Sequence, residues 1–304
     1  MHPSFRPNYI AFPLWMQARY HKASAWGQKH KRALSWPTSG LALLLVGAAL
    51  KQHGGWAALS EIRLTQWWCL ALAVAMWPLN LGLEVAKWKR LKAAQLPEQL
   101  QSRQTSSWRA ACHEVLRGQT WAFLAPFRMA DGLGRIRTMA QEHRGWDAAK
   151  AFGLGALCQG WATFAMGIPA LAMLGWPGSA AALGLGVLAA GGWLARDASN
   201  QPVLLLSVLR YGVFASQYLL CLAAFGAMHV NDLWSEGFPR VAGVWCVVSA
   251  LPWPAELGVR EAAAAWMFDS KIPAVVAGTF VVWALNRCLP ALMGIWPFQR
   301  VPNG

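Results

Sequence analysis

Charged residues are scarce in this chain, and the scarcity excludes most classes of soluble protein. Only 13% of the 304 residues are charged, whereas about a quarter are charged in a typical soluble domain. Hydrophobic residues make up 56% of the chain, and apolar runs near membrane-spanning length recur from residue 36 to the C-terminus. The composition therefore predicts an all-α fold, a polytopic bundle of membrane helices.

Clusters of metal-ligating residues are also missing from the sequence. The six cysteines stand singly and form no Cys-x-x-Cys or Cys/His cluster, so neither a zinc site nor a disulfide framework is expected. The seven histidines are dispersed and form no His-Glu-x-x-His pattern. We expect the cysteines to be buried packing residues, and we expect no metal and no cofactor.

Acidic residues are lacking from the first 60 positions, which contain seven Lys and Arg, and the whole chain carries a net charge of +14. A basic segment beside membrane helices favours anionic lipid headgroups, at roughly 1 kcal/mol per juxtamembrane cation, over nucleic acid. We therefore expect membrane lipids as partners and no nucleic acid. Residues 1–34 are predicted to be a basic, aromatic segment, either a helix in the headgroup plane or a loosely ordered tail. Residues 35–304 are predicted to form the transmembrane domain.

Tryptophan is abundant, and many of the 20 tryptophans lie near the ends of apolar runs. This placement is typical of the aromatic belts at membrane interfaces. Several of the apolar segments are shorter than the ~20 residues that cross a bilayer, so the sequence predicts six to nine membrane segments. The segments are 36–51, 64–86, 105–125, 151–173, 176–195, 202–228, 239–253, 257–269 and 272–297.

The distribution of Lys and Arg indicates the orientation. The N-terminal segment and residues 87–109, with six basic residues and one acidic residue, should both be cytoplasmic, and a hairpin of the first two spans allows this. Residues 126–150 hold five more Lys and Arg, yet one further crossing would place them outside. A segment that enters the membrane and turns back keeps them inside, where irregular backbone is tolerated beside a cavity. We therefore expect re-entry at this point.

Two interrupted segments are similar to each other, "APFRMADGLGRIRTM" at 125–139 and "LPWPAELGVREAAAA" at 251–265. Each has proline, a small residue and an acid, then glycine and leucine, then arginine. Their acids, Asp131 and Glu256, are 125 positions apart, close to half of the membrane domain. Paired breaks of this kind are typical of transporters built from inverted repeats. The predicted helix breaks are Pro126, Gly132, Gly134, Pro252, Pro254 and Gly258.

The charges in these breaks favour a phosphate-binding cleft. A charge at the bilayer centre costs at least about 2.5–3.5 kcal/mol, so ionisable residues there normally line a cavity or form pairs. Helix N-termini attract anions, and the planar fork of arginine matches phosphate oxygens. The alternative is a structural ion pair at the interface, with Arg260 held by an acid. We expect substrate contacts from Arg128, Arg135, Arg137, Arg210, Gln217 and Arg260, and counter-charges or switches at Asp131, Glu256 and Glu261.

Two further apolar segments carry isolated polar residues. Arg210 and Gln217 are seven positions apart in "LLLSVLRYGVFASQYLL", roughly on one helical face. Such a stripe faces the interior of a bundle, either for packing or for substrate. Arg287 lies three residues before Pro290, where a kink is expected. Its side chain either snorkels to the headgroups or serves the site.

Together, the three charged stretches resemble the lysylphosphatidylglycerol synthase transmembrane (flippase-like) family over roughly residues 36–298. "PWPAELGVREAA" resembles the family's Pro-x-x-Gly-Gly-Leu-Gly-Val-Arg-Glu signature, and "PFRMADGLGRIR" resembles its upstream Pro-x-Arg-x-Gly-(Asp/Glu)-x-x-Arg stretch. "LLLSVLRYGVFASQYLL" is similar to its later Ser-x-x-Arg span, which ends in glutamine. The chain departs from the family at Ala255 and Glu256, which replace Gly-Gly, and at Ala130, which replaces glycine.

The resemblance implies a bacterial inner-membrane protein that moves an anionic or phosphate-bearing lipid, or a lipid-linked molecule, between leaflets. We expect a cytoplasmic N-terminus and no soluble aminoacyl-transfer domain. No nucleophile–base pair or nucleotide loop is evident in the sequence, so we expect no catalytic residue and no enzyme. The first alternative is a non-catalytic scaffold for a separate lipid synthase or glycosyltransferase. The less favoured alternative is a membrane-embedded lipid-modifying enzyme.

Overall fold

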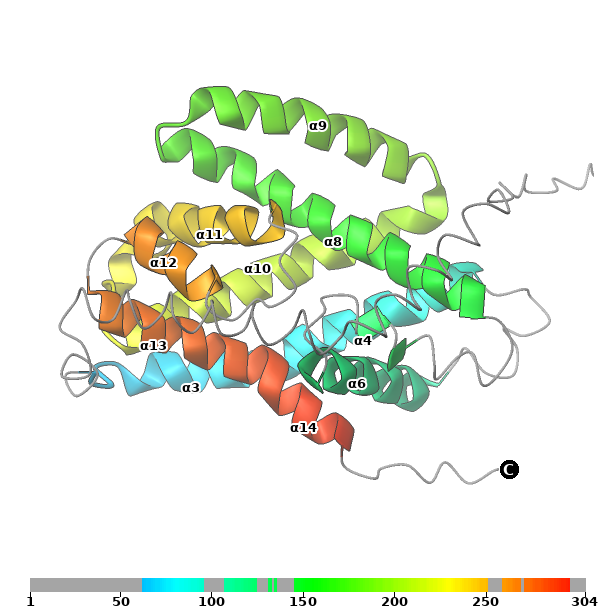
Figure 1. Ribbon diagram of the computed structural model, residues 1–304, viewed down its shortest axis with the longest axis horizontal. Coiled ribbons are helices and arrows are strands. Elements are labelled where there is room, and N and C mark those ends of the chain that lie inside the picture. Colours follow the sequence, from blue (N-terminus) through cyan, green and yellow to red (C-terminus); the bar gives the residue numbers. More distant parts are fainter. Residues whose placement is uncertain are drawn as a thin grey trace, which may run out of the picture.

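Helices make up all the regular structure in the described part of the chain (Figure 1). The computed structural model describes residues 62–95, 107–124, 131–132, 134–135, 145–250, 259–268 and 271–295. No strand occurs within these ranges, which confirms the predicted all-α class. The elements are α3 (Trp67–Ala75), α4 (Trp77–Gln95), α6 (Trp108–Leu124), α8 (Gly145–Met173), α9 (Pro177–Ala195), η1 (Ala198–Asn200), α10 (Gln201–Ala224), η2 (Val230–Asp232), η3 (Leu233–Gly237), α11 (Phe238–Ala250), α12 (Val259–Phe268), α13 (Ile272–Trp283), η4 (Ala284–Cys288) and α14 (Leu289–Ile295).

Five helical segments in the described residues are long and apolar enough to cross a membrane, and each matches a predicted span. The predicted segments 105–125, 239–253 and 257–269 contain α6, α11 and α12, which are helices but are not among the five. The predicted segments 1–34 and 36–51 lie outside the described residues. The five segments are Trp67–Ala94, Asp147–Met173, Pro177–Ala195, Ala198–Ala224 and Ile272–Ile295.

The helices turn apolar side chains outward and bury charged ones. On α9, Leu185 and Leu188 are each 73% exposed, whereas Glu84, Lys87 and Arg260 are less than a tenth exposed. In lipid, an outer surface of leucine is solvated, and ionisable groups face the interior of the bundle. This distribution of side chains identifies a membrane-embedded protein.

Tryptophans mark several ends of the spanning segments. Trp67 opens the first span, Trp176 immediately precedes α9, and Trp193 lies near the end of α9. All three side chains are exposed on the outer surface of the bundle. An aromatic ring with a polar edge is stable at the headgroup level. The positions of these tryptophans agree with the predicted interfacial belts.

Helix α10 lies at the centre of the bundle. It contacts α3, α4, α8, α11 and α13, and Figure 1 shows it between the α8–α9 hairpin and the layer of α3, α4 and α13. Every residue from 217 to 224 is buried. Arg210, Gln217 and Tyr218 of α10 bond to polar groups of α8, α3 and α13. Polar side chains inside a membrane need such partners, so these residues favour the central position of α10.

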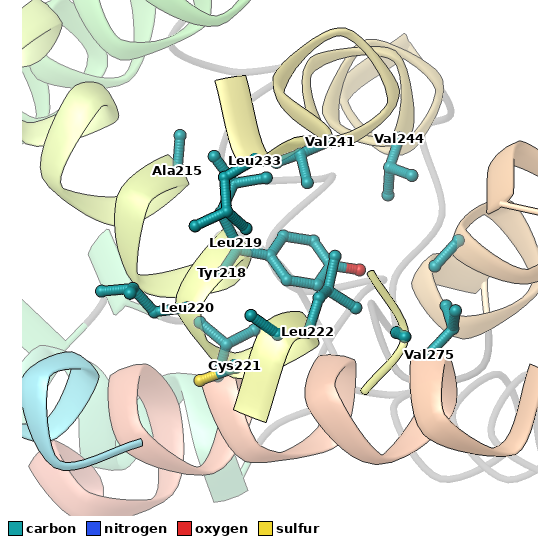
Figure 2. Packing of buried hydrophobic residues seen from close by; sticks show 14 of the residues in the cluster. Ala215, Tyr218, Leu219, Leu220, Cys221, Leu222, Leu233, Val241, Val244 and Val275 are labelled. Atoms are coloured by element: carbon teal, nitrogen blue, oxygen red, sulfur yellow. The ribbon is translucent and has the colours of Figure 1, made fainter. Parts of the chain in front are cut away.

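Tyr218 on α10 is the largest aromatic side chain in the core that Figure 2 shows. Its ring packs among aliphatic side chains that include Leu222 and Val244 (Figure 2). The Tyr218 hydroxyl lies 2.7 Å from Thr279 Oγ1, which itself donates to the carbonyl of Val275. Because a buried hydroxyl without a partner is unfavourable, this chain of hydrogen bonds fixes α13 against α10.

The last spanning segment is bent where the sequence predicts a kink. Residues Ala284–Cys288 form the π-helical turn η4 between α13 and α14, and Pro290 follows. Proline has no N–H with which to continue the hydrogen-bond ladder, so it favours such an interruption. Single π turns often occur at functional sites. This turn carries Asn286 and Arg287.

Glycines allow close helix crossings on both sides of this turn. A Cβ on Gly278 would lie 3.1 Å from the Cα of Leu222 on α10. A Cβ on Gly294 would collide with the carbonyl group of Leu116, where α14 crosses α6. Small residues at crossings let membrane helices gain packing that larger side chains would prevent.

Gly294→Ala is therefore expected to destabilise the protein by about 1–3 kcal/mol, the usual cost of overpacking. Gly186→Ala on α9 is the matched control, because a Cβ there meets nothing within 4 Å. Thermal melting in detergent should show a lower Tm for Gly294→Ala and no loss for Gly186→Ala. Equal Tm values for the two variants would contradict the close crossing of α14 and α6.

Candidate functional site

A cavity of about 410 Å³ lies within the bundle and gathers most of its buried charges. Its walls come from α4, α6, α8, α10, α11, α12, α13, η4 and the helical residues Asp131 and Arg135. The volume falls in the range of sites that hold a small molecule or a headgroup, roughly 300–1,000 Å³. Five cationic and two anionic side chains line the described walls. They are Lys87, Arg135, Arg210, Arg260, Arg287, Glu84 and Asp131.

Glu84 on α4 is the anionic centre of one wall. Its Oε2 lies 2.7 Å from Lys87 Nζ and 3.3 Å from Arg210 Nη1, and its Oε1 lies 2.8 Å from Arg135 Nη2. The three cations come from α4, α10 and the helical residues 131–135. Because isolated charges are strongly disfavoured in a low-dielectric interior, Glu84 stabilises all three of these side chains.

Gln159 on α8 orients two of these cations. Its Oε1 accepts hydrogen bonds from Lys87 Nζ at 3.2 Å and from Arg210 Nη1 at 3.1 Å. The amide oxygen is neutral, so it directs both donors without neutralising them. Lys87 and Arg210 therefore share two acceptors, Glu84 and Gln159.

Arg135 is the most firmly held cation of the site. Its Nε and Nη2 donate to the two carboxylate oxygens of Asp131 at 2.7 and 2.8 Å. Its guanidinium lies over the rings of Trp88 and Phe152, 5.2 and 5.9 Å from their centroids. Burial alone would lower the pKa of Arg135, but the carboxylates of Asp131 and Glu84 raise it, so the side chain stays charged.

Glycines bring the helical residues 131–135 against α6. A Cβ on Gly134 would lie 2.9 Å from the Cα of Gly118, and a Cβ on Gly118 would meet the Asp131 carboxylate. A Cβ on Gly132 would lie 2.6 Å from the ring of Phe152. Gly132 and Gly134 are in helical conformation rather than at a break, which departs from their predicted role. They allow the close approach that places Arg135 in the cavity wall.

Arg260 lies in the first turn of α12 and is only 2% exposed. Its Nη2 pairs with the carboxylate of Glu261, the neighbouring residue. Its guanidinium lies 5.9 Å from the centroid of the Trp283 ring. The ion pair neutralises one side of the guanidinium group, and Arg260 Nε has no hydrogen-bond partner among the described residues.

Three more buried donor groups in the cavity wall lack an acceptor, as Arg260 Nε does. Within the described part of the chain, no hydrogen-bond partner exists for Arg210 Nε, the Tyr211 hydroxyl or Trp245 Nε1, and all three residues line the cavity. Each unpaired buried donor is unfavourable by about 1–3 kcal/mol. Together with Arg260 Nε, they form a set of four donors that a ligand with several acceptor oxygens would satisfy.

The arrangement is suited to binding an oxyanion. Cations and free N–H and O–H donors line one enclosed space, and charge-assisted hydrogen bonds are strongest in such a setting. Within the described ranges, no group of three or more His, Cys, Asp and Glu side chains gathers as a metal site. The chemistry of the described wall is that of an anion receptor.

Four of the predicted site residues meet in this cavity: Asp131, Arg135, Arg210 and Arg260. Glu261 lies beside it, paired with Arg260. Arg287 also lines the cavity, where its Nη1 donates to Gln119 Oε1 at 3.0 Å. The structure therefore supports contact of Arg287 with the site over the alternative, in which its side chain reaches the headgroups. The predicted residues Arg128, Arg137, Glu256, Pro126, Pro252, Pro254 and Gly258 lie outside the described residues.

The structure does not bring Gln217 into the cavity wall. Its Nε2 donates to the carbonyl of Ala73 at 2.9 Å, and its Oε1 accepts from Asn80 Nδ2 at 3.1 Å. Asn80 also donates to Oδ1 of Asn286. The polar stripe on α10 therefore places Arg210 at the cavity wall and Gln217 in contacts between helices.

Several residues of the site were not predicted. Glu84 falls inside the predicted span 64–86, and Lys87 is the first residue of the predicted cytoplasmic segment 87–109, so neither belongs to the predicted charged breaks. Their spacing of three positions, which places both on one helical face, was the available signal. Tyr211 and Trp245 carry no such signal, because buried aromatic residues are common in any membrane bundle.

Comparison with known proteins finds no counterpart: no family model, no curated protein and no solved structure matches the chain. The function is therefore argued from the geometry of the cavity.

Arg135→Met should destabilise the fold by about 3–5 kcal/mol, because it leaves Asp131 and Glu84 as buried charges with fewer partners. Arg240→Met is the matched control, since the Arg240–Glu236 pair is much more exposed, at 3.5 Å, and such pairs contribute about 0–1 kcal/mol. Denaturation of the purified protein in detergent measures both changes. A loss for Arg135→Met no larger than that for Arg240→Met would contradict the central role of the buried network.

Proposed function

We propose that this protein is an integral membrane lipid transporter that moves an anionic or phosphate-bearing lipid, or a lipid-linked molecule, between leaflets. The observation that carries the proposal is the set of four unpaired donors beside five cationic side chains in one cavity of a membrane bundle. A phosphate supplies several acceptor oxygens for these donors, and its negative charge offsets the excess of five cations over two carboxylates in the described wall. The proposal places the chain in a bacterial inner membrane with a cytoplasmic N-terminus.

The position of the cavity favours a lipid over a soluble anion. The cavity lies among helices whose outer faces expose leucine and tryptophan side chains such as Leu157, Leu205 and Trp266. Acyl chains are well solvated against those faces, whereas a charged headgroup in the hydrocarbon region is strongly disfavoured without a polar path. A receptor for the headgroup inside the bundle lowers that barrier while the acyl chains stay in the bilayer.

Arg260 and Arg210 are the proposed headgroup contacts. Each is buried or half-buried at the cavity wall and keeps an Nε–H without an acceptor. Arginine binds phosphate through two parallel donors. In this arrangement, Glu261 holds Arg260 in place, and Glu84 and Gln159 hold Arg210. The carboxylates of Glu261 and Glu84 therefore orient the two guanidinium groups before the headgroup binds.

Transport is tested in liposomes that contain the purified protein and a fluorescent lipid, with a membrane-impermeant quencher outside. Fluorescent phosphatidylglycerol should lose its inner-leaflet protection faster than fluorescent phosphatidylcholine. Arg260→Ala should slow the phosphatidylglycerol rate by about tenfold or more, because a hydrogen bond to a charged group contributes about 1.5–3 kcal/mol. Arg240→Ala, outside the cavity lining, should retain the wild-type rate.

Two results would contradict the proposal. One is a folded wild-type protein that gives the same rates as empty liposomes for both lipids. The other is an Arg260→Ala protein that transports at the wild-type rate, which would remove Arg260 from the site.

A pair of tyrosines on α10 offers a sharper test of the unpaired donors. Tyr211→Phe removes a free cavity hydroxyl, whereas Tyr218→Phe removes one that is already bonded to Thr279. Tyr211→Phe should weaken binding of short-chain phosphatidylglycerol by about twofold to tenfold, which corresponds to one neutral hydrogen bond of about 0.5–1.5 kcal/mol.

Tyr218→Phe should lower the Tm without changing this affinity. Titration calorimetry in detergent measures both affinities, and thermal melting measures both stabilities. An affinity loss in Tyr218→Phe alone would contradict the assignment of the Tyr211 hydroxyl to the ligand.

A further inference from the structure

The carboxylate of Glu84 occupies the place among the cations that an anionic ligand would need. It contacts Lys87, Arg135 and Arg210 at 2.7, 2.8 and 3.3 Å, and the residue is 7% exposed. All four residues line the cavity. An incoming phosphate and this carboxylate therefore compete for the same donors.

The three cations do not depend on Glu84 equally. Arg135 has a second carboxylate, because Asp131 accepts two hydrogen bonds from it. For Lys87 and Arg210, the acceptors are Glu84 and the neutral oxygen of Gln159. Lys87 and Arg210 are thus the cations that a ligand can take over without leaving Asp131 unpaired.

Exchange of these partners changes the charge balance around Glu84. Once a phosphate binds Lys87 and Arg210, the carboxylate of Glu84 faces the anionic ligand in a low-dielectric interior. A carboxylate that loses cationic neighbours and gains an anionic one favours its protonated form. The balanced step is transfer of one proton from hydronium or a buffer acid to the Glu84 carboxylate, which gives a neutral carboxyl group with an O–H donor and leaves the conjugate base in solution.

We propose that Glu84 is the resident counter-anion of the cavity, that the anionic group of the ligand displaces it from Lys87 and Arg210, and that this exchange takes up one proton. The inference rests on the proposed function, and it adds the regulation of the same site. Since the ligand-bound state holds one more proton, binding strengthens as the pH falls. A proton gradient across the membrane then favours loading from the acidic side.

Other charged and titratable groups lie on the elements packed against α4, and the charged ones have partners of their own. On α6, Glu114 accepts from Lys92 and Trp88. Arg287 on η4 is bonded to Gln119, and Cys158 is buried on α8 next to Gln159. Of the described carboxylates in the cavity wall, Asp131 is already paired with Arg135. Glu84 is therefore the carboxylate whose partners the ligand takes.

The test is titration calorimetry of the wild-type protein in detergent with short-chain phosphatidylglycerol. Its phosphodiester does not titrate between pH 5 and 8, so any proton taken up goes to the protein. Runs in buffers of different ionisation enthalpy give the number of protons per ligand. The expected result is about one proton, with affinity rising up to about tenfold per unit fall in pH.

Glu84→Gln is the matched variant, because it keeps the shape of the side chain and removes its charge and its proton. It should bind phosphatidylglycerol more tightly than wild type at pH 8, with no proton uptake and no pH dependence. Glu236→Gln, at an exposed acid outside the cavity lining, should keep the proton uptake of wild type. Infrared difference spectra of wild type should also gain the band of a protonated carboxyl group on binding, which tests the step even if Glu84→Gln fails to fold.

The outcomes separate the two proposals. Binding by wild type without proton uptake overturns the exchange at Glu84 and leaves the lipid site intact. Proton uptake that persists in Glu84→Gln assigns the proton elsewhere and also overturns the inference. No binding by folded wild type at any pH contradicts the proposed function itself.

Discussion

The ion cluster around Glu84 is the constraint on which the rest of the structure depends. Three cations and two carboxylates lie together in the interior of a membrane bundle, where the surrounding lipid offers them no solvation. Each charge is stable only because a buried partner lies beside it, either in the same segment, as in Glu84–Lys87 and Asp131–Arg135, or across segments, as in Glu84 with Arg135 and Arg210. The pairs across segments tie α4 to α10 and to the helical residues 131–132 and 134–135, and they fix the cationic wall before any ligand is present.

The apolar helices around this cluster make such a wall possible. Helix α10 packs against α3, α4, α8, α11 and α13, and it carries Arg210 and Tyr211 into the cavity. Glycine contacts at Gly118 and Gly134 bring Arg135 close, and the π turn η4 aims Arg287 inward. Leucines and tryptophans cover the outside. Because lipid surrounds the bundle, apolar side chains are favoured on its outside and charged side chains are favoured in its interior.

Much of this organisation follows from the sequence, and the remainder depends on tertiary contacts. Apolar length and the scarcity of charge predict the helices, and buried arginines predict the cavity, because ionisable residues in a membrane need a polar setting. The seven-residue spacing of Arg210 and Gln217 predicts one face, yet at 1.5 Å per residue they stand about 10 Å apart along the axis. They therefore meet different neighbours. The pairing of Glu84 with Arg135 and Arg210 requires three helices to meet, which no local pattern specifies.

The central claim is that a phosphate belongs among the unpaired donors of the cavity. Electron cryomicroscopy of the protein in nanodiscs that contain phosphatidylglycerol tests this claim most directly. The account predicts headgroup density in the cavity, with phosphate oxygens within hydrogen-bond distance of Arg260 Nε and the Tyr211 hydroxyl. A well-ordered bundle whose cavity holds only water, with every lipid phosphate at the membrane surface, would contradict it.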